Sequence, residues 1–266
     1  MKIAIVGFGN MGQTYANSFM SSGFVGASDI LVLNRKEVDE KFRFGIDAIN
    51  FYTEPNAAIF SSDILILAVK PQDFKQLAFV IKPFLNDEHV VLSVMAGISI
   101  ETMQNELGIT KIVRSMPNIP TQIGEGMTVF CASNAVDRKE LFIVQNLINT
   151  TGKSIYIDRE EMLNAATAVS GSGPAYVFYF MQAMIESAVK LGFSTSEAEF
   201  LVSQTFSGSV QLHNRSNLSN EVWIQRVASK GGTTEAALSV FNQNNLLQIV
   251  IDGIEAANLR AIELGA

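Results

Sequence analysis

The sequence has little cysteine and little histidine: its 266 residues include one cysteine, Cys131, and two histidines, His89 and His213. A single cysteine excludes a disulfide within the chain, as is typical of proteins from a reducing compartment. Neither histidine has a second His or Cys at ligand spacing, so we predict no metal site. Cys131 lies in the apolar run Met127–Ala132, and we expect it to be a small buried side chain.

The chain also lacks long apolar runs and clusters of basic residues. No stretch reaches the roughly 18 apolar residues that a membrane span requires, and the apolar run at Met1–Gly7 is too short for a signal peptide. The formal net charge of -7 argues against nucleic acid or an anionic membrane surface as a partner. We therefore expect a globular, cytoplasmic protein that binds a small molecule.

Strand-like and helix-like segments alternate over the first part of the chain. Short apolar runs typical of buried parallel strands alternate with amphipathic segments, which predicts a doubly wound α/β sheet. The expected strands are Ile3–Val6, Ile30–Leu33, Ile64–Val69, Val90–Val94, Ile112–Ser115, Met127–Ala132 and Ser154–Ile157. The expected helices between them are Met11–Ser22, Asp73–Phe84, Ile100–Leu107 and Lys139–Asn149.

After about residue 160 the strand signal disappears and helical periodicity takes over. The expected helices are Tyr176–Leu191, Thr195–His213, Glu221–Ala228, Thr234–Phe241 and Leu246–Leu264. We therefore predict two domains, a dinucleotide-binding domain over 1–159 and an all-helical domain over 160–266.

A glycine fingerprint, Gly7-Phe8-Gly9-Asn10-Met11-Gly12, follows the first expected strand and opens the first helix. In that context Gly7 permits the tight turn, Gly9 lets the backbone approach a pyrophosphate, and Gly12 allows the helix to pack on the strand. The N–H groups at the helix start would bind the phosphate. The alternative is a glycine turn without a ligand.

The end of the second strand, Leu33-Asn34-Arg35, indicates which dinucleotide binds. An NAD site usually has an acidic residue there, which binds the ribose 2′-hydroxyl. Arg35 can instead grip a 2′-phosphate, so we predict NADPH, with NADH used more weakly. The alternative is a solvated surface arginine.

Further polar or stiff segments follow later strands, at the edge of the sheet where ligands bind. They are Ala68-Val69-Lys70-Pro71-Gln72, Ser93–Gly97 and Ser115–Pro120. Lys70 is equally compatible with an exposed loop lysine.

Two glycine-rich segments lie in the second half. Ser170-Gly171-Ser172-Gly173-Pro174 precedes an apolar helix, and we expect Ser172 or Gly173 to be its N-cap. Ser229-Lys230-Gly231-Gly232-Thr233-Thr234 opens another helix, where free backbone N–H groups would form an anion site. A glycine loop before a capped helix remains an alternative for the second segment.

Taken together, these segments resemble the pyrroline-5-carboxylate reductases of proline biosynthesis over nearly the whole chain. The matches are the glycine fingerprint, Ala68–Gln72, Arg114–Pro120, Gly171–Tyr176 and Ser229–Ala237. The resemblance implies a Rossmann domain followed by a helical dimerisation domain whose helices interlock with those of a partner. It also implies an active site between the cofactor domain and the helical domain of the neighbouring chain, and often rings of dimers such as decamers.

The resemblance further implies individual roles. Thr234 would hydrogen-bond the substrate's ring nitrogen, and the carboxylate would be held by Ser229, Gly231, Gly232, Thr233 and Thr234, mainly through backbone N–H groups. The cofactor would contact Gly7, Phe8, Gly9, Asn10, Met11, Gly12, Asn34, Arg35, Asn56, Ala68, Val69, Lys70, Pro71, Met95, Ala96 and Gly97. One departure is Lys230, where many members of the family have proline.

The implied reaction is hydride transfer from NADPH to the C=N carbon of 1-pyrroline-5-carboxylate, which forms L-proline. A related cyclic imine is a possible substrate. A second reading is an NADP-linked 3-hydroxyacid dehydrogenase, which would need a proton-transfer lysine on the central helix; Lys190 is the only lysine there, near the helix end. A third is a non-catalytic, cofactor-sensing relative, which the intact Gly231–Thr234 loop disfavours.

Overall fold

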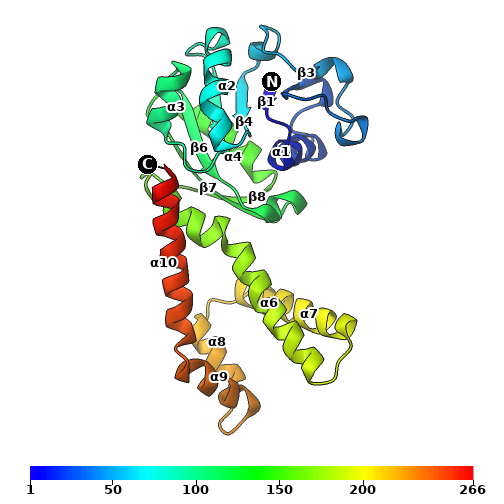
Figure 1. Cartoon of the computed structure of the whole chain (residues 1–266), viewed down its shortest axis with the longest axis vertical. Helices are drawn as coiled ribbons and strands as arrows, with labels where there is room; N and C mark the ends of the chain where they lie inside the picture. The colour runs from blue at the N-terminus through cyan, green and yellow to red at the C-terminus, as the bar shows by residue number, and fades with distance from the viewer. Residues whose placement is uncertain (266) are drawn as a thin grey trace. The chain divides into compact units, whose positions relative to one another are not determined.

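The computed structural model describes residues 1–265. Its first part is an eight-stranded sheet in the order β3-β2-β1-β4-β5-β6-β7-β8, drawn in Figure 1. Every neighbouring pair is parallel except β6 and β7. The strands are β1 (Ile3–Val6), β2 (Ile30–Leu33), β3 (Phe51–Tyr52), β4 (Ile64–Leu67), β5 (Val90–Ser93), β6 (Ile112–Met116), β7 (Gly126–Ala132) and β8 (Gly152–Tyr156).

Four helices cover the two faces of this sheet. They are α1 (Asn10–Ser21), α2 (Phe74–Ile81), α3 (Ile100–Leu107) and α4 (Arg138–Asn149). Side chains from α1 and α4 share one buried cluster with alternate strand residues, and side chains from α2 and α3 share the other. Because both faces are covered, β1, β2, β4 and β5 are buried along their whole length, which explains their uninterrupted apolar runs.

The register brings the carboxyl ends of the central strands together. Val6 at the end of β1 pairs with Leu33 at the end of β2 and with Leu67 at the end of β4. The chain crosses from β2 and β3 on one side of β1 to β4 on the other. In such sheets the crevice at this switch point is where ligands bind.

The sheet leads into a nearly continuous helical stretch that contains a π-helix. It consists of α5 (Met162–Ala166), the π-helix Thr167–Gly171 and α6 (Gly173–Lys190). Gly173 is the first residue of α6, so Ser172 lies at the predicted N-cap position. Ser172 has helical backbone angles (φ -84, ψ -19) instead of the extended ones typical of an N-cap, because the π-helix ends directly before it. Pro174 does lie in the first turn of α6.

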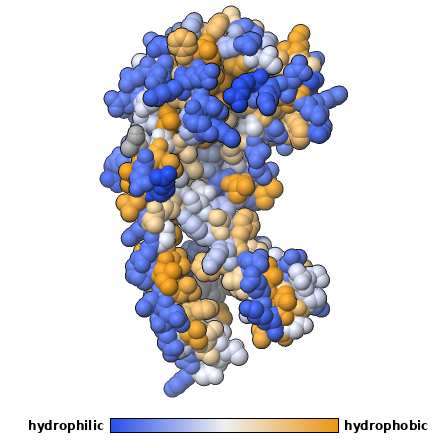
Figure 2. Space-filling view, viewed as in Figure 1, coloured by the Kyte–Doolittle hydropathy of each residue, from blue (hydrophilic) through white to orange (hydrophobic). Residues whose placement is uncertain are grey.

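The remaining elements are helical: α7 (Thr195–Asn214), α8 (Asn220–Val227), α9 (Thr233–Gln243) and α10 (Leu246–Gly265). Over 173–256, Ala198 and Val202 are the only described apolar residues that are buried. Large apolar side chains are instead exposed on α6, α7 and α10, among them Phe178, Tyr179, Phe200, Leu247 and Ile249. Figure 2 shows apolar residues at their surface. None of the described helices combines the length and apolar character that crossing a membrane requires.

The chain forms two compact units, one of Met1–Ser172 with the end of α10 from Ala257, and one of Gly173–Ala256. Our predicted boundary at 159/160 assigns α5 and the π-helix to the helical domain, and it stays a prediction. The predicted fold class is confirmed: a mostly parallel, doubly wound sheet is followed by helices alone.

Candidate functional site

A groove of ≈ 520 Å³ lies at the carboxyl ends of β1, β2 and β4. Eight of the predicted cofactor residues line it: Gly7, Phe8, Gly9, Asn34, Arg35, Ala68, Val69 and Lys70. These residues come from three separate turns, which the parallel register brings to one edge. The groove therefore has the position that the fold favours for a dinucleotide.

The glycine fingerprint has the geometry that each glycine was predicted to provide. Gly7 has a φ of 94°, and a Cβ there would lie 2.8 Å from the carbonyl carbon of Ala68. A Cβ on Gly12 would collide with the carbonyl oxygen of Gly7, so α1 packs directly on the turn. A Cβ on Gly9 would meet nothing within 4 Å. The space in front of Gly9 is open, which fits the close approach of a phosphate.

The start of α1 presents unpaired donors to this space. Its N-cap is Gly9, which has no side chain with which to accept a hydrogen bond. No acceptor among residues 1–265 bonds the backbone N–H groups of Gly9, Asn10, Met11 or Gly12. Free N–H groups at a helix start attract an anion. Asn10, Met11 and Gly12 thus fit the predicted role through their backbone.

Asn34 holds the turn in place instead of projecting freely. Its Oδ1 accepts from the Phe8 N–H at 3.0 Å, and its Nδ2 donates to the Lys36 carbonyl oxygen at 2.8 Å. The side chain therefore ties the glycine loop to the end of β2. Oδ1 keeps a second lone pair and Nδ2 a second hydrogen, so Asn34 could still bond a cofactor while it holds the turn.

Three basic side chains line the groove: Arg35, Lys36 and Lys70. All three are exposed, and none has an ion-pair partner within the described part of the chain. Glu54 and Asp73 also line the groove. Open backbone donors and unpaired cations together fit a ligand that carries several phosphates.

The other predicted cofactor residues lie outside the lining of the groove. Asn56 Oδ1 accepts from the Ala58 N–H at 2.9 Å and so caps a turn. Pro71 starts the short helical turn before α2. Met95 is buried in the core with 2% exposure, whereas Ala96 is exposed. Gly97 has a φ of 76°, and a Cβ there would lie 3.0 Å from the carbonyl oxygen of Leu264. Their cofactor contacts stay predictions.

Two parts of the groove were not expected from the sequence, namely Thr53–Pro55 and the side chains of Gln76, Leu77 and Val80. The first follows β3, which has only two residues and so shows no periodicity. The second lies on α2, where Leu77 and Val80 look like ordinary core positions. The position of Thr53–Pro55 after an aromatic pair was the only available signal.

The second candidate region is the turn before α9. The Gly231 N–H donates to Glu235 Oε2 at 2.6 Å, and the Gly232 N–H donates to the Ser229 carbonyl oxygen at 2.9 Å. Both glycine donors predicted to hold a carboxylate are thus engaged within the chain. The N–H groups of Thr233, Thr234 and Glu235 have no acceptor among residues 1–265. The donors available to an anion therefore belong to the first turn of α9.

Thr234 is the second residue of α9 and is half-buried. Its hydroxyl lies on the same helical turn as the free N–H groups. The side chain of Lys230 is exposed and has no ion-pair partner in the described chain. A carboxylate and a neighbouring ring nitrogen could therefore both be bound at this turn.

Two other candidate groups are structural. Burial raises the pKa of the Cys131 thiol to about 12, so it stays protonated and is no nucleophile. Arg114, from another segment that matched the family, forms an ion pair of 2.7 Å with Glu160, which also accepts from the Ile100 N–H. Lys190, which a 3-hydroxyacid dehydrogenase would need, is exposed and is the last residue of α6.

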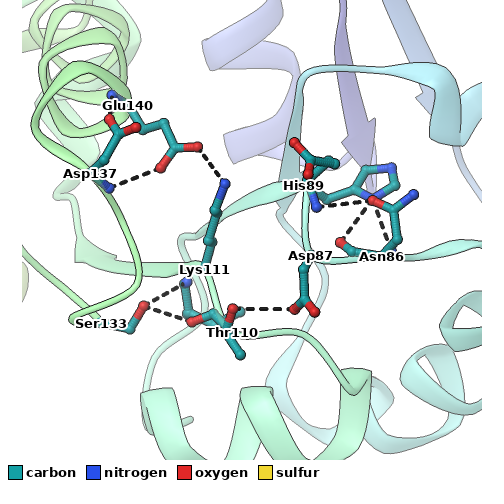
Figure 3. A network of polar contacts seen from close by, with 10 residues as sticks. Asn86, Asp87, His89, Thr110, Lys111, Ser133, Asp137 and Glu140 are labelled. Atoms are coloured by element: carbon teal, nitrogen blue, oxygen red, sulfur yellow. Dashed lines mark hydrogen bonds and ion pairs between the residues drawn. The ribbon is translucent and has the colours of Figure 1, made fainter.

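A second hollow, of ≈ 560 Å³, lies at the amino ends of β4 and β5. Its polar groups bond one another, as Figure 3 shows. Glu140 accepts from Lys111 Nζ at 2.8 Å and from the Asp137 N–H at 2.9 Å, and His89 Nε2 lies 2.7 Å from the Phe60 carbonyl oxygen. The Glu140 carboxylate raises the pKa of Lys111. These pairings stabilise the fold and leave few groups for a ligand.

Comparison with known proteins gives two family matches. Residues 160–264 match the model for pyrroline-5-carboxylate reductase dimerisation. Residues 2–97 match the model for coenzyme F420-dependent NADP oxidoreductases.

Individual proteins are similar over nearly their full length. The pyrroline-5-carboxylate reductase of Pseudomonas aeruginosa is 33% identical, with 99% of this chain and 96% of that protein covered. Pyrroline-5-carboxylate reductase 2 of Bacillus subtilis is 32% identical, with 99% and 95% covered. The structure of the Coxiella burnetii reductase has a TM-score of 0.89 at 31% identity, and that of Plasmodium falciparum, with NADP bound, 0.90 at 28%. Each covers 100% of this chain and 98% of the other.

Proposed function

The chain belongs to the pyrroline-5-carboxylate reductase family, and we propose that it uses NADPH to reduce 1-pyrroline-5-carboxylate to L-proline in the last step of proline biosynthesis. It is an oxidoreductase of the NAD(P)-dependent kind. The choice of NADPH, the individual residue roles, the oligomer and a cytoplasmic location are the parts that we propose. The proposal depends most on one observation: two helices begin with free N–H groups, α1 at the groove and α9 beside a threonine hydroxyl.

The groove at β1, β2 and β4 fits a phosphorylated dinucleotide. The N–H groups of Gly9–Gly12 would bind the pyrophosphate, with Gly9 leaving room for its approach. When bound, the dinucleotide supplies the hydride for the reaction. The groove would hold the cofactor at the edge of the sheet where the strands end.

Arg35 would set the preference for NADPH. It follows β2, where an acidic residue would suit NADH, and it lines the groove without an ion-pair partner in the described chain. A planar guanidinium can bind a phosphate through two parallel hydrogen bonds. Lys36, whose carbonyl oxygen is held by Asn34, would add a second positive charge.

The first turn of α9 would bind the substrate. Its free N–H groups at Thr233, Thr234 and Glu235 would hold the carboxylate, which the helix dipole also favours. The Thr234 hydroxyl would accept a hydrogen bond from the protonated ring nitrogen and so orient the C=N bond. A protonated imine is the more electrophilic form, so the site needs no strong acid of its own. Holding the reacting groups in place is then the main contribution of the chain.

A homodimer with interlocked helices, extending in some relatives to rings of dimers, would cover the exposed apolar residues of α6, α7 and α10. Residues 160–264 match a dimerisation domain, and the helical unit buries few apolar side chains by itself. Apolar exposure on this scale is typical of an interface. Light scattering at micromolar concentration should give at least twice the 29.0 kDa of one chain; a stable, active monomer would contradict the proposal.

The activity is tested by following NADPH oxidation with 1-pyrroline-5-carboxylate and, in parallel, with piperideine-6-carboxylate, which has the six-membered ring. We expect turnover with both and a higher kcat/KM for the five-membered ring. A clear preference for the larger ring would reassign the substrate. The absence of turnover with either imine would contradict the proposed reaction.

A further inference from the structure

Three helices of this chain carry a glutamate at the third position, and its carboxylate bonds back to a backbone N–H before the helix. In α4, Glu140 accepts from the N–H of its N-cap, Asp137, at 2.9 Å. In α7, Glu197 accepts from the N–H of its N-cap, Ser194, at 2.9 Å. In both helices the N-cap side chain returns a bond to the glutamate N–H, which completes a capping box.

In α9 the reciprocal half of this arrangement is missing. The N-cap is Gly232, which has no side chain, and its N–H is already bonded to the Ser229 carbonyl oxygen. Glu235 therefore reaches one residue further and accepts from the Gly231 N–H at 2.6 Å. Its carboxylate closes a turn in which Gly231 has a φ of 70°. The N–H groups of the first helical turn stay free beside this carboxylate.

Glu235 thus has two opposite effects on an anion at the start of α9. Its bond to Gly231 holds the turn in the conformation that leaves the helix donors open. Its negative charge lies next to those donors and repels a carboxylate that binds them, although water screens the repulsion at this exposed position. The bond favours binding and the charge opposes it.

We infer that Glu235 tunes carboxylate binding at this turn: it holds the turn open for the substrate's carboxylate, and its charge limits how tightly that turn retains the carboxylate of the product. This inference rests on the proposed function. Weak retention suits a reductase, because substrate and product carry the same carboxylate and a tightly held product would block the next turnover.

Glu235→Gln separates the two effects, since the amide oxygen can still accept from Gly231 while the charge is removed. We expect the KM for 1-pyrroline-5-carboxylate and the inhibition constant of L-proline each to fall about two- to five-fold, the size of a screened interaction between neighbouring charges. The KM for NADPH should not change. L-prolinamide, which keeps the ring and lacks the carboxylate, should inhibit the variant no better than the wild type.

The matched control is Glu197→Gln, which changes the same position of α7 in a complete capping box. It should leave the KM values and L-proline inhibition unchanged. Glu235→Ala removes the bond as well as the charge, so its KM for the imine should exceed that of Glu235→Gln. Thermal melting of all three variants checks their folding.

The inference is overturned if Glu235→Gln leaves L-proline inhibition unchanged or weakens it, or if L-proline and L-prolinamide gain equally. It is also overturned if Glu235→Ala and Glu235→Gln have the same KM, since the bond to Gly231 would then have no effect. These results require a wild type that reduces 1-pyrroline-5-carboxylate. If the wild type does not reduce it, the proposed function itself has failed.

Discussion

Among residues 1–265, six α-helices are preceded by an N-cap residue in extended conformation, and they fall into two groups. In α3, α4, α7 and α8 the N-cap is Ser99, Asp137, Ser194 or Ser219, whose side chain accepts from the N–H three residues later. In α1 and α9 the N-cap is Gly9 or Gly232, and no side chain occupies these donors. The two glycine-capped starts are the two to which we assign an anion.

The difference separates helix starts that stabilise the fold from helix starts that bind. A serine or aspartate N-cap accepts from one free N–H. Replacing it by alanine costs a helix about 1 kcal/mol, whereas replacing it by glycine costs only about a few tenths of a kcal/mol. Glycine is therefore an inexpensive way to leave donors free for a ligand. We call a helix start open when its N-cap is glycine and closed when a side chain accepts from its N–H groups; substitutions that close an open start or open a closed one test this difference.

The largest effect should come from closing the start of α1 with Gly9→Asp. The new carboxylate would accept the free N–H groups of α1 and repel the cofactor's phosphates. The loss of two charge-assisted hydrogen bonds, each about 1.5–3 kcal/mol, should weaken NADPH binding roughly 100-fold or more. Calorimetric titration of NADPH measures it.

Gly9→Ala is the steric control, because a Cβ at this position meets nothing within 4 Å. It should leave the melting temperature unchanged and weaken NADPH binding less than Gly9→Asp does, since its Cβ takes up room beside the phosphate but adds no charge. If neither variant weakens NADPH binding, the start of α1 does not hold the pyrophosphate.

Arg35→Ala should have the next largest effect, and on one cofactor only. Removing the guanidinium from a 2′-phosphate should cost about 1.5–3 kcal/mol, or roughly 10- to 150-fold in the Michaelis constant for NADPH. The constant for NADH, which lacks that phosphate, should change little. Initial rates with both cofactors provide the internal control, and an equal effect on both would reject the assignment of Arg35.

Thr234→Ala removes the hydroxyl at the start of α9 and so tests its part in the reaction. We expect turnover to fall about 10- to 100-fold with NADPH affinity nearly unchanged, since an orienting hydrogen bond is worth less than a general acid. Thr234→Ser should keep most of the activity. Thr195→Ala, which removes a threonine from the first turn of α7, is the matched control and should keep full turnover. Unchanged turnover in Thr234→Ala would mean that the hydroxyl has no part in the reaction.

The smallest effect should come from opening a closed start with Ser219→Ala in α8. The lost cap should lower the free energy of unfolding by about 1 kcal/mol, measured by urea denaturation at fixed protein concentration. The kinetic constants should stay as in the wild type. A change in the KM for the imine would show that this serine cap is part of the binding site.

Much of the sheet domain could be predicted from the sequence, because buried parallel strands have a simple signature. Ile100–Leu107 was predicted with its observed bounds as α3, and its two ends carry ordinary stop signals, Ser99 and Gly108. β3 was missed because two residues show no period. The start of α6 after Ser172 was predicted, but the π-helix that precedes it was missed, because Ser and Gly residues are equally typical of a loop.

The position of the candidate site could be predicted from the sequence, whereas the hydrogen bonds of its side chains could not. The turns after β1, β2 and β4 were expected at one edge, where the groove lies. The Asn34 side chain bonds the backbone of Phe8 and Lys36, and these contacts depend on the three-dimensional path of the turn. The hydrogen bond from the Gly231 N–H to the Glu235 carboxylate joins residues four positions apart, and local composition does not specify it.

The most direct test of the account compares 1-pyrroline-5-carboxylate with 1-pyrroline, the same ring imine without the carboxylate, as substrates under saturating NADPH. If the free N–H groups of α9 bind that carboxylate, its loss removes at least two charge-assisted hydrogen bonds, and kcat/KM should fall roughly 100-fold or more. The fall should shrink in Glu235→Ala, whose turn is no longer held. Similar kcat/KM values for the two imines in the wild type would contradict the assignment of α9 as the substrate site.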